Sequence, residues 1–202
     1  MSPVKIEQLE RIGGALCLDF VNTVDPRYAS PRLEFLPDFA ALVEWAEEVA
    51  VIDRKEARRL KAAAVRRPDE ALDIYQRGIA LREALFEVFR GRVHHKPAKR
   101  DFGLLNEELA RSRSRELVAQ PAGDVRRVWP PDDDLARVVW PIVESAADLL
   151  CSSAVSRVRE CEGERCGWLF LDTSKAGRRR WCSMADCGNR AKAQRRSAAS
   201  RS

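Results

Sequence analysis

Apolar residues recur at helical spacing through much of the first 155 residues, and this pattern predicts a mainly helical body. One apolar stripe begins after Pro37 and consists of Phe39, Leu42, Val43, Ala46 and Val49. A second stripe, on a longer segment that starts at Pro68 and ends near Gly91, consists of Leu72, Tyr75, Ile79, Leu85, Val88 and Phe89. Both patterns place apolar side chains on one face of an α-helix, and Pro suits the first turn of each.

Other segments complete the predicted body. Residues 15–25 (ALCLDFVNTVD) and 99–113 have helical patterns, and Asp53 can cap a helix that follows it. The run ELVAQPAGDVRRVWP predicts a β-hairpin around its Pro-Ala-Gly-Asp turn. A last helix follows the acids at 132–134, and Pro141 should kink this helix without breaking it. The expected fold class is therefore α+β, with a mainly helical N-terminal domain and one small hairpin.

Six cysteines are present, and four of them form a regular arrangement. Cys161 and Cys166 are separated by four residues, as are Cys182 and Cys187, and fifteen residues lie between the two pairs. Two short loops can each present two sulfur atoms to one point, which is typical of a closed, structural Zn2+ site. Disulfides and core cysteines are the alternatives, and the reducing conditions of a cytoplasm argue against disulfides. We expect one structural zinc ion.

The other two cysteines, Cys17 and Cys151, each occur singly in an apolar helical segment. A free cysteine in such a segment usually behaves as a small hydrophobic residue. We therefore predict that both are packing residues.

The zinc module is expected to span residues 156–202, after a body of residues 1–155. The stretch WLFLD predicts a strand, and after a turn a second strand is expected to end near Trp181. Ser183 can cap a helix that carries Cys187 in its first turns. We call the short turn that carries Cys161 and Cys166 the first knuckle. This knuckle, a hairpin and a ligand-bearing helix together predict a treble-clef or zinc-ribbon-like finger. Its few bulky apolar residues make metal necessary, with roughly 10 kcal/mol of stabilisation.

Positive charge is concentrated in this module. The chain carries a net charge of +5, whereas residues 155–202 hold twelve Lys and Arg against five Asp and Glu, or +7. The remaining 154 residues therefore carry −2. Clustered cations are typical of phosphate contacts with nucleic acid, and the candidates here are Arg178, Arg179, Arg180, Lys192, Arg195 and Arg196. A solvated basic tail, or one that binds an acidic partner, is the alternative.

Zn2+ with four thiolates has a formal charge of −2, so some cations should serve only to neutralise the metal site. Arg190, three residues after Cys187, is the one most suited to this task.

The stretch WLFLDTSKAGRRRWCSMADCGNRAKAQRR resembles the CGNR zinc-finger family, named for the tetrapeptide at residues 187–190. Upstream, GGALCLDFVNTVD resembles the opening of the α/β domain that accompanies this finger in bacterial stress-induced transcription regulators. The resemblance implies a DNA-binding regulator whose CGNR helix, with Asn189 and Arg190, contacts DNA. The zinc ligands that it implies are Cys161, Cys166, Cys182 and Cys187. The turn at 175–177 is less basic than expected of a phosphate clamp, which favours Arg178–Arg180 and the helix as DNA contacts.

An effector site in the body is a further hypothesis. If residues 15–25 are helical, Asp19, Asn22 and Thr23 share a face and could line a small-molecule pocket. The alternative is that Asp19 and Asn22 satisfy buried backbone groups or pair with an arginine such as Arg27.

Signatures of catalysis are missing from the sequence. It contains no nucleophile elbow, phosphate loop or dinucleotide fingerprint, and the histidines, His94 and His95, are expected to be solvated. We therefore expect a protein that is not an enzyme. No run approaches the roughly 20 apolar residues of a membrane span, which predicts a cytoplasmic protein without a membrane partner. An interaction or ligand-sensing protein that uses the finger as a scaffold is the alternative to a DNA-binding regulator.

Overall fold

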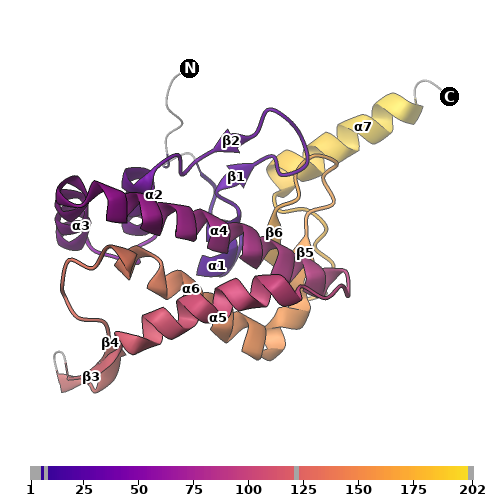
Figure 1. The fold of residues 1–202 in the computed structure, drawn as a ribbon. Coiled ribbons are helices and arrows are strands. Elements are labelled where there is room, and N and C mark those ends of the chain that lie inside the picture. Colours follow the sequence, from indigo (N-terminus) through magenta and orange to yellow (C-terminus); the bar gives the residue numbers. More distant parts are fainter. Residues whose placement is uncertain (1–5, 7–8, 121–122, 200–202) are drawn as a thin grey trace.

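Helices packed around the short helix α1 (Leu16–Val21) make up most of the chain (Figure 1). The computed structural model describes residue 6, residues 9–120 and residues 123–199. The other helices are α2 (Phe39–Glu48), α3 (Arg54–Arg66), α4 (Pro68–Val93), α5 (Lys99–Ser114), α6 (Trp140–Cys151) and α7 (Asn189–Ala199). Four side chains of α1 are fully buried, at Cys17, Leu18, Phe20 and Val21. The hydrophobic core of the body therefore surrounds α1.

Local signals position the helices of the body. The Asp38 carboxylate accepts a hydrogen bond from the amide of Ala41 at 2.8 Å, and the Asp53 carboxylate accepts one from Glu56 at 2.7 Å. These contacts satisfy amides that have no acceptor within the first turn of α2 and of α3. Pro68 occupies the first turn of α4, where its missing N–H costs nothing. The predicted mainly helical body is confirmed.

The first predicted helix is shorter than residues 15–25. Helix α1 ends at Val21, and the chain continues as β1 (Val24–Asp25), which pairs antiparallel with β2 (Leu33–Glu34). Asn22 is the C-cap residue of α1, and its side chain bonds the backbone of Leu169. The end of this helix is therefore tied to a residue far away in the sequence.

Pro141 begins a helix, so the prediction of a kink was wrong. Residues Leu135–Val138 form a separate 3-10 helix, capped by the Asp134 carboxylate, which accepts from the amide of Ala136 at 3.0 Å. Helix α6 then starts at Trp140, with Pro141 in its first turn. Proline lacks the N–H that an interior turn requires, and the first turn is the place where that N–H is not needed.

Two predicted core positions are exposed. Cys17 is buried as predicted, and its amide donates to the Ser145 hydroxyl at 3.2 Å. Cys151, however, is exposed at the last residue of α6, on the side of the helix opposite Leu149. Leu72, near the start of α4, is also exposed, to 53%.

The predicted hairpin is present at β3 (Leu117–Ala119) and β4 (Arg126–Val128), which pair antiparallel with Val118 opposite Arg127. Residues 121–122 of its predicted turn lie outside the described part of the chain. In the described ranges, no helix combines the length and apolar character needed to cross a membrane.

A third hairpin joins the C-terminal module to the body. After α6, the 3-10 helix Ser153–Arg157 leads into β5 (Val158–Glu160), which pairs with β6 (Leu169–Leu171). Leu169 and Phe170 are fully buried and belong to the same hydrophobic core as the helices. The amide side chain of Asn22 donates to the carbonyl of Leu169 at 2.8 Å and accepts from its N–H at 3.0 Å.

Replacement of Asn22 should therefore destabilise the whole chain. In Asn22→Ala, the buried N–H and carbonyl of Leu169 both lose their partner, and we expect the free energy of unfolding to fall by about 3 kcal/mol. Urea denaturation followed by circular dichroism measures this change. The matched control is Asn106→Ala on the exposed face of α5, which should stay within about 0.5 kcal/mol of the parent. Equal effects of the two substitutions would contradict the assigned role.

Candidate metal centre

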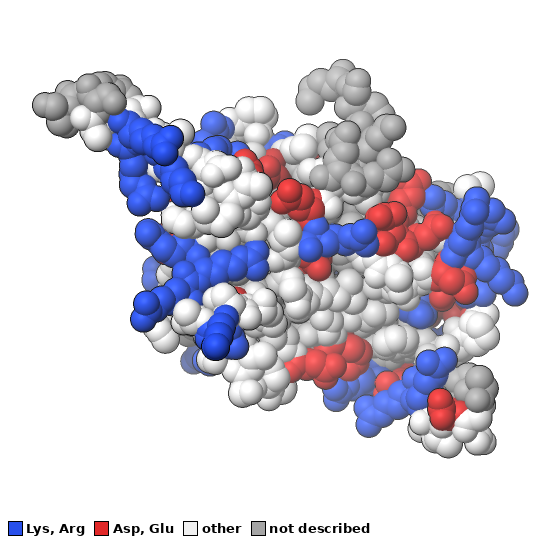
Figure 2. All heavy atoms as spheres, turned by 180° about the vertical axis from the view of Figure 1, so that it is seen from behind, with Lys and Arg blue, Asp and Glu red and all other residues white. Residues whose placement is uncertain are grey.

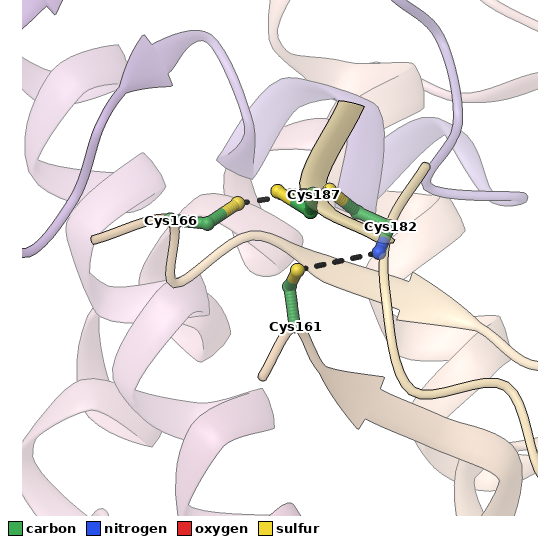
Figure 3. A group of neighbouring side chains, drawn as sticks. All are labelled: Cys161, Cys166, Cys182 and Cys187. Atoms are coloured by element: carbon green, nitrogen blue, oxygen red, sulfur yellow. Dashed lines mark hydrogen bonds between the residues drawn. The ribbon is translucent and has the colours of Figure 1, made fainter. Parts of the chain in front are cut away.

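Four cysteine side chains from three segments converge on one point at the end of the molecule formed by the C-terminal module (Figure 3). Cys161 and Cys166 lie in the turn between β5 and β6, Cys182 ends the loop after β6, and Cys187 lies in the turn before α7. All four are buried, with exposures of 5% or less. Their sulfur atoms lie within 4.8 Å of one another.

The spacing of these sulfur atoms fits a tetrahedral metal ion. The Sγ atoms of Cys166 and Cys182 are 3.6 Å apart, and those of Cys182 and Cys187 are 3.7 Å apart. A Zn–S bond of about 2.3 Å in tetrahedral geometry places two sulfurs about 3.8 Å apart. Four thiolates leave no open coordination position, so the residues fit one structural Zn2+.

The electrostatics of the site also favour a bound metal ion, because four sulfur atoms this close cannot all be deprotonated without a cation. Hydrogen bonding with Cys166 lowers the pKa of Cys161, whereas hydrogen bonding with Cys161 raises the pKa of Cys166 and of Cys182. Burial raises the pKa of Cys187. A bound Zn2+ reverses these penalties and keeps every ligand deprotonated.

The first knuckle lies between the two strands of the β5–β6 hairpin. The prediction of a second strand that ends near Trp181 was wrong. The partner of β6 is β5, which precedes the first cysteine pair. After β6, the fully buried Asp172 accepts hydrogen bonds from the amides of Ser174 at 2.9 Å and Arg179 at 3.0 Å. These bonds close residues 172–179 into a loop, so the loop returns to the metal site without forming a strand.

The second cysteine pair leads into a helix, as predicted. The Ser183 hydroxyl accepts from the amide of Asp186 at 3.3 Å, and residues Met184–Gly188 form a π-helical turn that continues into α7. The amide of Cys182 donates to the Sγ of Cys161 at 3.3 Å (Figure 3). A backbone N–H directed at a thiolate stabilises its charge, in addition to the metal.

The last two residues of the CGNR tetrapeptide make side-chain contacts within the finger. Arg190 Nη2 donates to the Sγ of Cys187 at 3.0 Å and forms an ion pair with Asp186 at 2.9 Å. Asn189 donates its side-chain amide to the carbonyl of Ala185 at 2.9 Å. Arg190 therefore neutralises a thiolate, as expected, and both side chains are engaged inside the finger.

Three consecutive arginines of the predicted DNA-contacting set have different surroundings. Arg178 is exposed. Arg179 is directed inward, since it donates to the carbonyls of Trp181 and Cys182 and lies over the Phe170 ring. Arg180 forms an ion pair with Glu162. Arg178 alone of these three extends into solvent without an ion pair or hydrogen bond among the described residues.

Helix α7 carries the remaining candidates. Lys192, Arg195 and Arg196 are all exposed, and α7 buries none of its described side chains. Arg195 bonds the carbonyl of Ala191 through Nε at 3.3 Å and lies 5.9 Å from the centre of the Trp181 ring.

The loop between β1 and β2 of the body is hydrogen-bonded to the first knuckle. The amide of Arg27 donates to the carbonyl of Cys166 at 2.9 Å, and the amide of Tyr28 donates to Arg165 at 3.1 Å. Gly167 adopts φ +72°, and a Cβ there would lie 2.7 Å from the Tyr28 ring. Only glycine allows this approach. The sequence offered no signal for these contacts, because loop residues 27–28 are over 130 positions away.

The candidate effector residues are engaged in packing. Asp19 accepts from the amide of Gly13 at 2.8 Å, Asn22 bonds Leu169, and Thr23 donates to the carbonyl of Phe20 at 2.7 Å. These bonds match the alternative in which the side chains satisfy backbone groups, and Arg27 pairs with Glu83. A cavity of about 370 Å3 between body and finger is lined by Asp25, beside Cys166 and Cys187.

His94 is not simply solvated. It ends α4, and its Nε2 contacts the Glu160 carboxylate, which also accepts from the Tyr28 hydroxyl. Arg90 lies 3.8 Å from the same carboxylate. The sequence could not indicate this contact, because Glu160 is brought to His94 only when β5 docks beside α4. The cluster ties the end of α4 to the strand that precedes Cys161.

The fold and site define a zinc-finger protein with a helical body. The family model described as ABATE, "Putative stress-induced transcription regulator", matches residues 14–153, and the CGNR zinc finger model matches residues 157–199. Because the first match covers more than half of the sequence, this chain belongs to the ABATE family, and it carries a CGNR zinc finger. A comparison with curated proteins finds no match. Both matches support a zinc-binding protein from a family of transcription regulators.

Zinc content provides the first test of the site. The purified chain should hold about one Zn2+, and Cys182→Ser should abolish retention, because three thiolates leave a coordination position open. The matched control Cys151→Ser changes an exposed cysteine outside the site and should leave the content at about one. Elemental analysis after dialysis against a weak chelator measures both. A Cys182→Ser variant with full metal content would refute the ligand set.

Arg190 provides a second test. In Arg190→Gln, the Cys187 thiolate loses its charged donor, and we expect zinc to be retained about 10- to 100-fold less tightly. Competition with a colorimetric chelator measures the change in affinity. Lys192→Gln removes the same charge from the same helix without touching sulfur, so its zinc affinity should match the parent. If both variants released zinc equally easily, Arg190 would have no specific role at the metal.

Proposed function

We propose that this chain is a zinc-dependent DNA-binding transcription regulator that acts in the cytoplasm and has no catalytic activity. The finger contacts duplex DNA, and the body senses or transmits a signal. The observation that carries this proposal is the exposed basic helix α7, which the zinc site anchors at its first turn and which buries none of its described side chains.

The distribution of charge supports a polyanionic partner. Lys and Arg gather over α7 and over the loop before it, at one end of the molecule (Figure 2). In Figure 1, α7 projects from that end, away from the helices of the body. If the finger served only to pack against its own body, this basic face would be covered. Instead the finger docks through β5 and β6, and the cations of α7 are exposed.

The contacts reduce the set of cations that are available to phosphate. Arg179, Arg180 and Arg190 are held by carbonyls, by Glu162 and by Cys187 respectively, so we assign them to the structure of the finger. Asn189 is likewise assigned to the turn before α7. The cations that we assign to DNA backbone contacts are Arg178, Lys192 and Arg195.

A second candidate function is a ligand-sensing or interaction protein that uses the finger as a scaffold. The cavity between Asp25 and the metal site favours it, because a small molecule there would touch body and finger together. Such a protein needs no nucleic acid, so DNA binding separates the two candidates.

Salt dependence of DNA binding tests the main proposal. Each lost phosphate contact should reduce the slope of log affinity against log salt concentration by about 0.9, so Lys192→Gln with Arg195→Gln should reduce it by about 1.8. Fluorescence anisotropy with a labelled 30-base-pair duplex of mixed sequence over several salt concentrations measures the slope. Zinc content should stay unchanged, because neither side chain contacts sulfur.

The control removes a cation at the other end of the molecule. Arg54→Gln on α3 makes the same change in net charge as Lys192→Gln alone, but far from the finger, so its slope should equal that of the parent, whereas Lys192→Gln should reduce the slope by about 0.9. If Arg54→Gln and Lys192→Gln had equal effects, binding would reflect net charge and not the finger. If the zinc-loaded chain did not bind duplex DNA, the main proposal would be rejected, and the second candidate, in which the finger is a scaffold, would remain.

A further inference from the structure

An apolar groove lies at the end of the body remote from the finger. It occupies about 460 Å3 between the start of α2, the end of α3 and the start of α4. Two large aliphatic side chains project at its edge, Val65 with 83% of its surface exposed and Leu72 with 53%. Pro37, Ala40 and Pro68 line the same groove and are exposed as well.

These exposed residues are not needed for the core of the body. The periodicity of α4 places Leu72 in its apolar stripe, yet the helices leave it in solvent. Phe39 and Ala71 form a buried floor to the groove, so it is a shaped depression and not a flat patch. A concave apolar surface with exposed aliphatic side chains at its edge can seat an apolar side chain of a partner.

A row of cations on α3 extends from this groove. Arg54, Arg58, Lys61 and Val65 follow one another at intervals of four, three and four residues, so they form one stripe along the helix. Among the described residues, neither Arg54 nor Arg58 has a hydrogen bond or ion pair, whereas Lys61 pairs with Glu44. Arg54 begins the helix, where the positive end of the helix dipole disfavours a cation. The stability of α3 therefore does not explain why an arginine occupies position 54.

We propose that this groove and stripe bind an acidic, amphipathic α-helix of a partner protein. Apolar side chains of that helix would contact Val65 and Leu72, and its carboxylates would lie along Arg58 and Arg54. The stripe from residue 54 to residue 65 spans about 17 Å, the length of three helical turns. Recognition by an apolar groove with a charged border is a common mode for single helices.

Other occupants fit this surface less well. Nucleic acid needs cations where Val65 and Leu72 lie, and these aliphatic side chains offer nothing to phosphate. A second copy in a twofold dimer would bring the same cationic stripe against itself. Figure 2 shows Lys and Arg at this end of the molecule as well as at the finger, so the two surfaces are separate. The proposal does not depend on DNA binding by α7.

A synthetic peptide tests the proposal with the full-length, zinc-loaded chain. The probe is a fluorescein-labelled peptide of about 15 residues, with Leu at positions i, i+3, i+4 and i+7 and Glu at most others. We expect binding by fluorescence anisotropy, and a loss of at least about tenfold in affinity for Val65→Ser with Leu72→Ser. Arg58→Gln should weaken binding and lower its salt dependence. The matched variant Val118→Ser removes an aliphatic side chain that is 74% exposed on β3 and should bind like the parent.

Three results would overturn the proposal. The first is no binding of the acidic peptide, or binding that Val65→Ser with Leu72→Ser leaves unchanged while circular dichroism shows a folded chain. The second is light scattering that shows a dimer converted to a monomer by the same pair of substitutions, which would make the groove a self-interface. The third is displacement of the peptide by duplex DNA from a chain that carries Lys192→Gln with Arg195→Gln on α7, which would make the stripe a nucleic-acid surface. Peptides with Lys in place of Glu, or Ser in place of Leu, should bind at least about tenfold more weakly.

Discussion

The charge of four buried sulfur atoms is the constraint on which the rest of the finger depends. Four thiolates within 4.8 Å of one another are tolerable only around a cation, and even Zn2+ leaves an excess of two negative charges. Arg190 and the amide of Cys182 offset part of this excess by direct contacts with sulfur. The CGNR tetrapeptide thus combines a ligand, a turn and a counter-charge. Part of the positive charge near this tetrapeptide therefore serves to neutralise the metal site, and only the remainder is available to a partner.

The metal site also connects the finger to the body. The hairpin that carries the first knuckle contributes Leu169 and Phe170 to the core of the helices, and Asn22 holds its backbone from the other side. Arg27 and Tyr28 close over the same knuckle. The hairpin that carries the first cysteine pair is therefore part of both the metal site and the core of the body.

Features with a local cause were predictable from the sequence, and features with a distant cause were not. Asp53 and Pro68 start helices through contacts within one turn, as predicted. Pro37, which was expected in the first turn of α2, instead precedes the capping residue Asp38. The cysteine spacing likewise specified the metal centre. In contrast, Asn22 at the end of α1 bonds a partner 147 residues away, and the buried Asp172 replaces the expected strand by a loop. Neither partnership leaves a trace in a short window of sequence.

Helix α4 extends between the two ends of the molecule and contacts the structures at both. It starts at the apolar groove, and its 26 residues make it about 39 Å long. Midway, Arg82 is almost fully buried in an ion pair with Glu34 on β2, which fixes the hairpin whose loop holds the first knuckle. At its end, Arg90 and His94 contact Glu160, the residue before Cys161. One continuous helix therefore extends from the proposed partner groove to the residue that precedes the first zinc ligand.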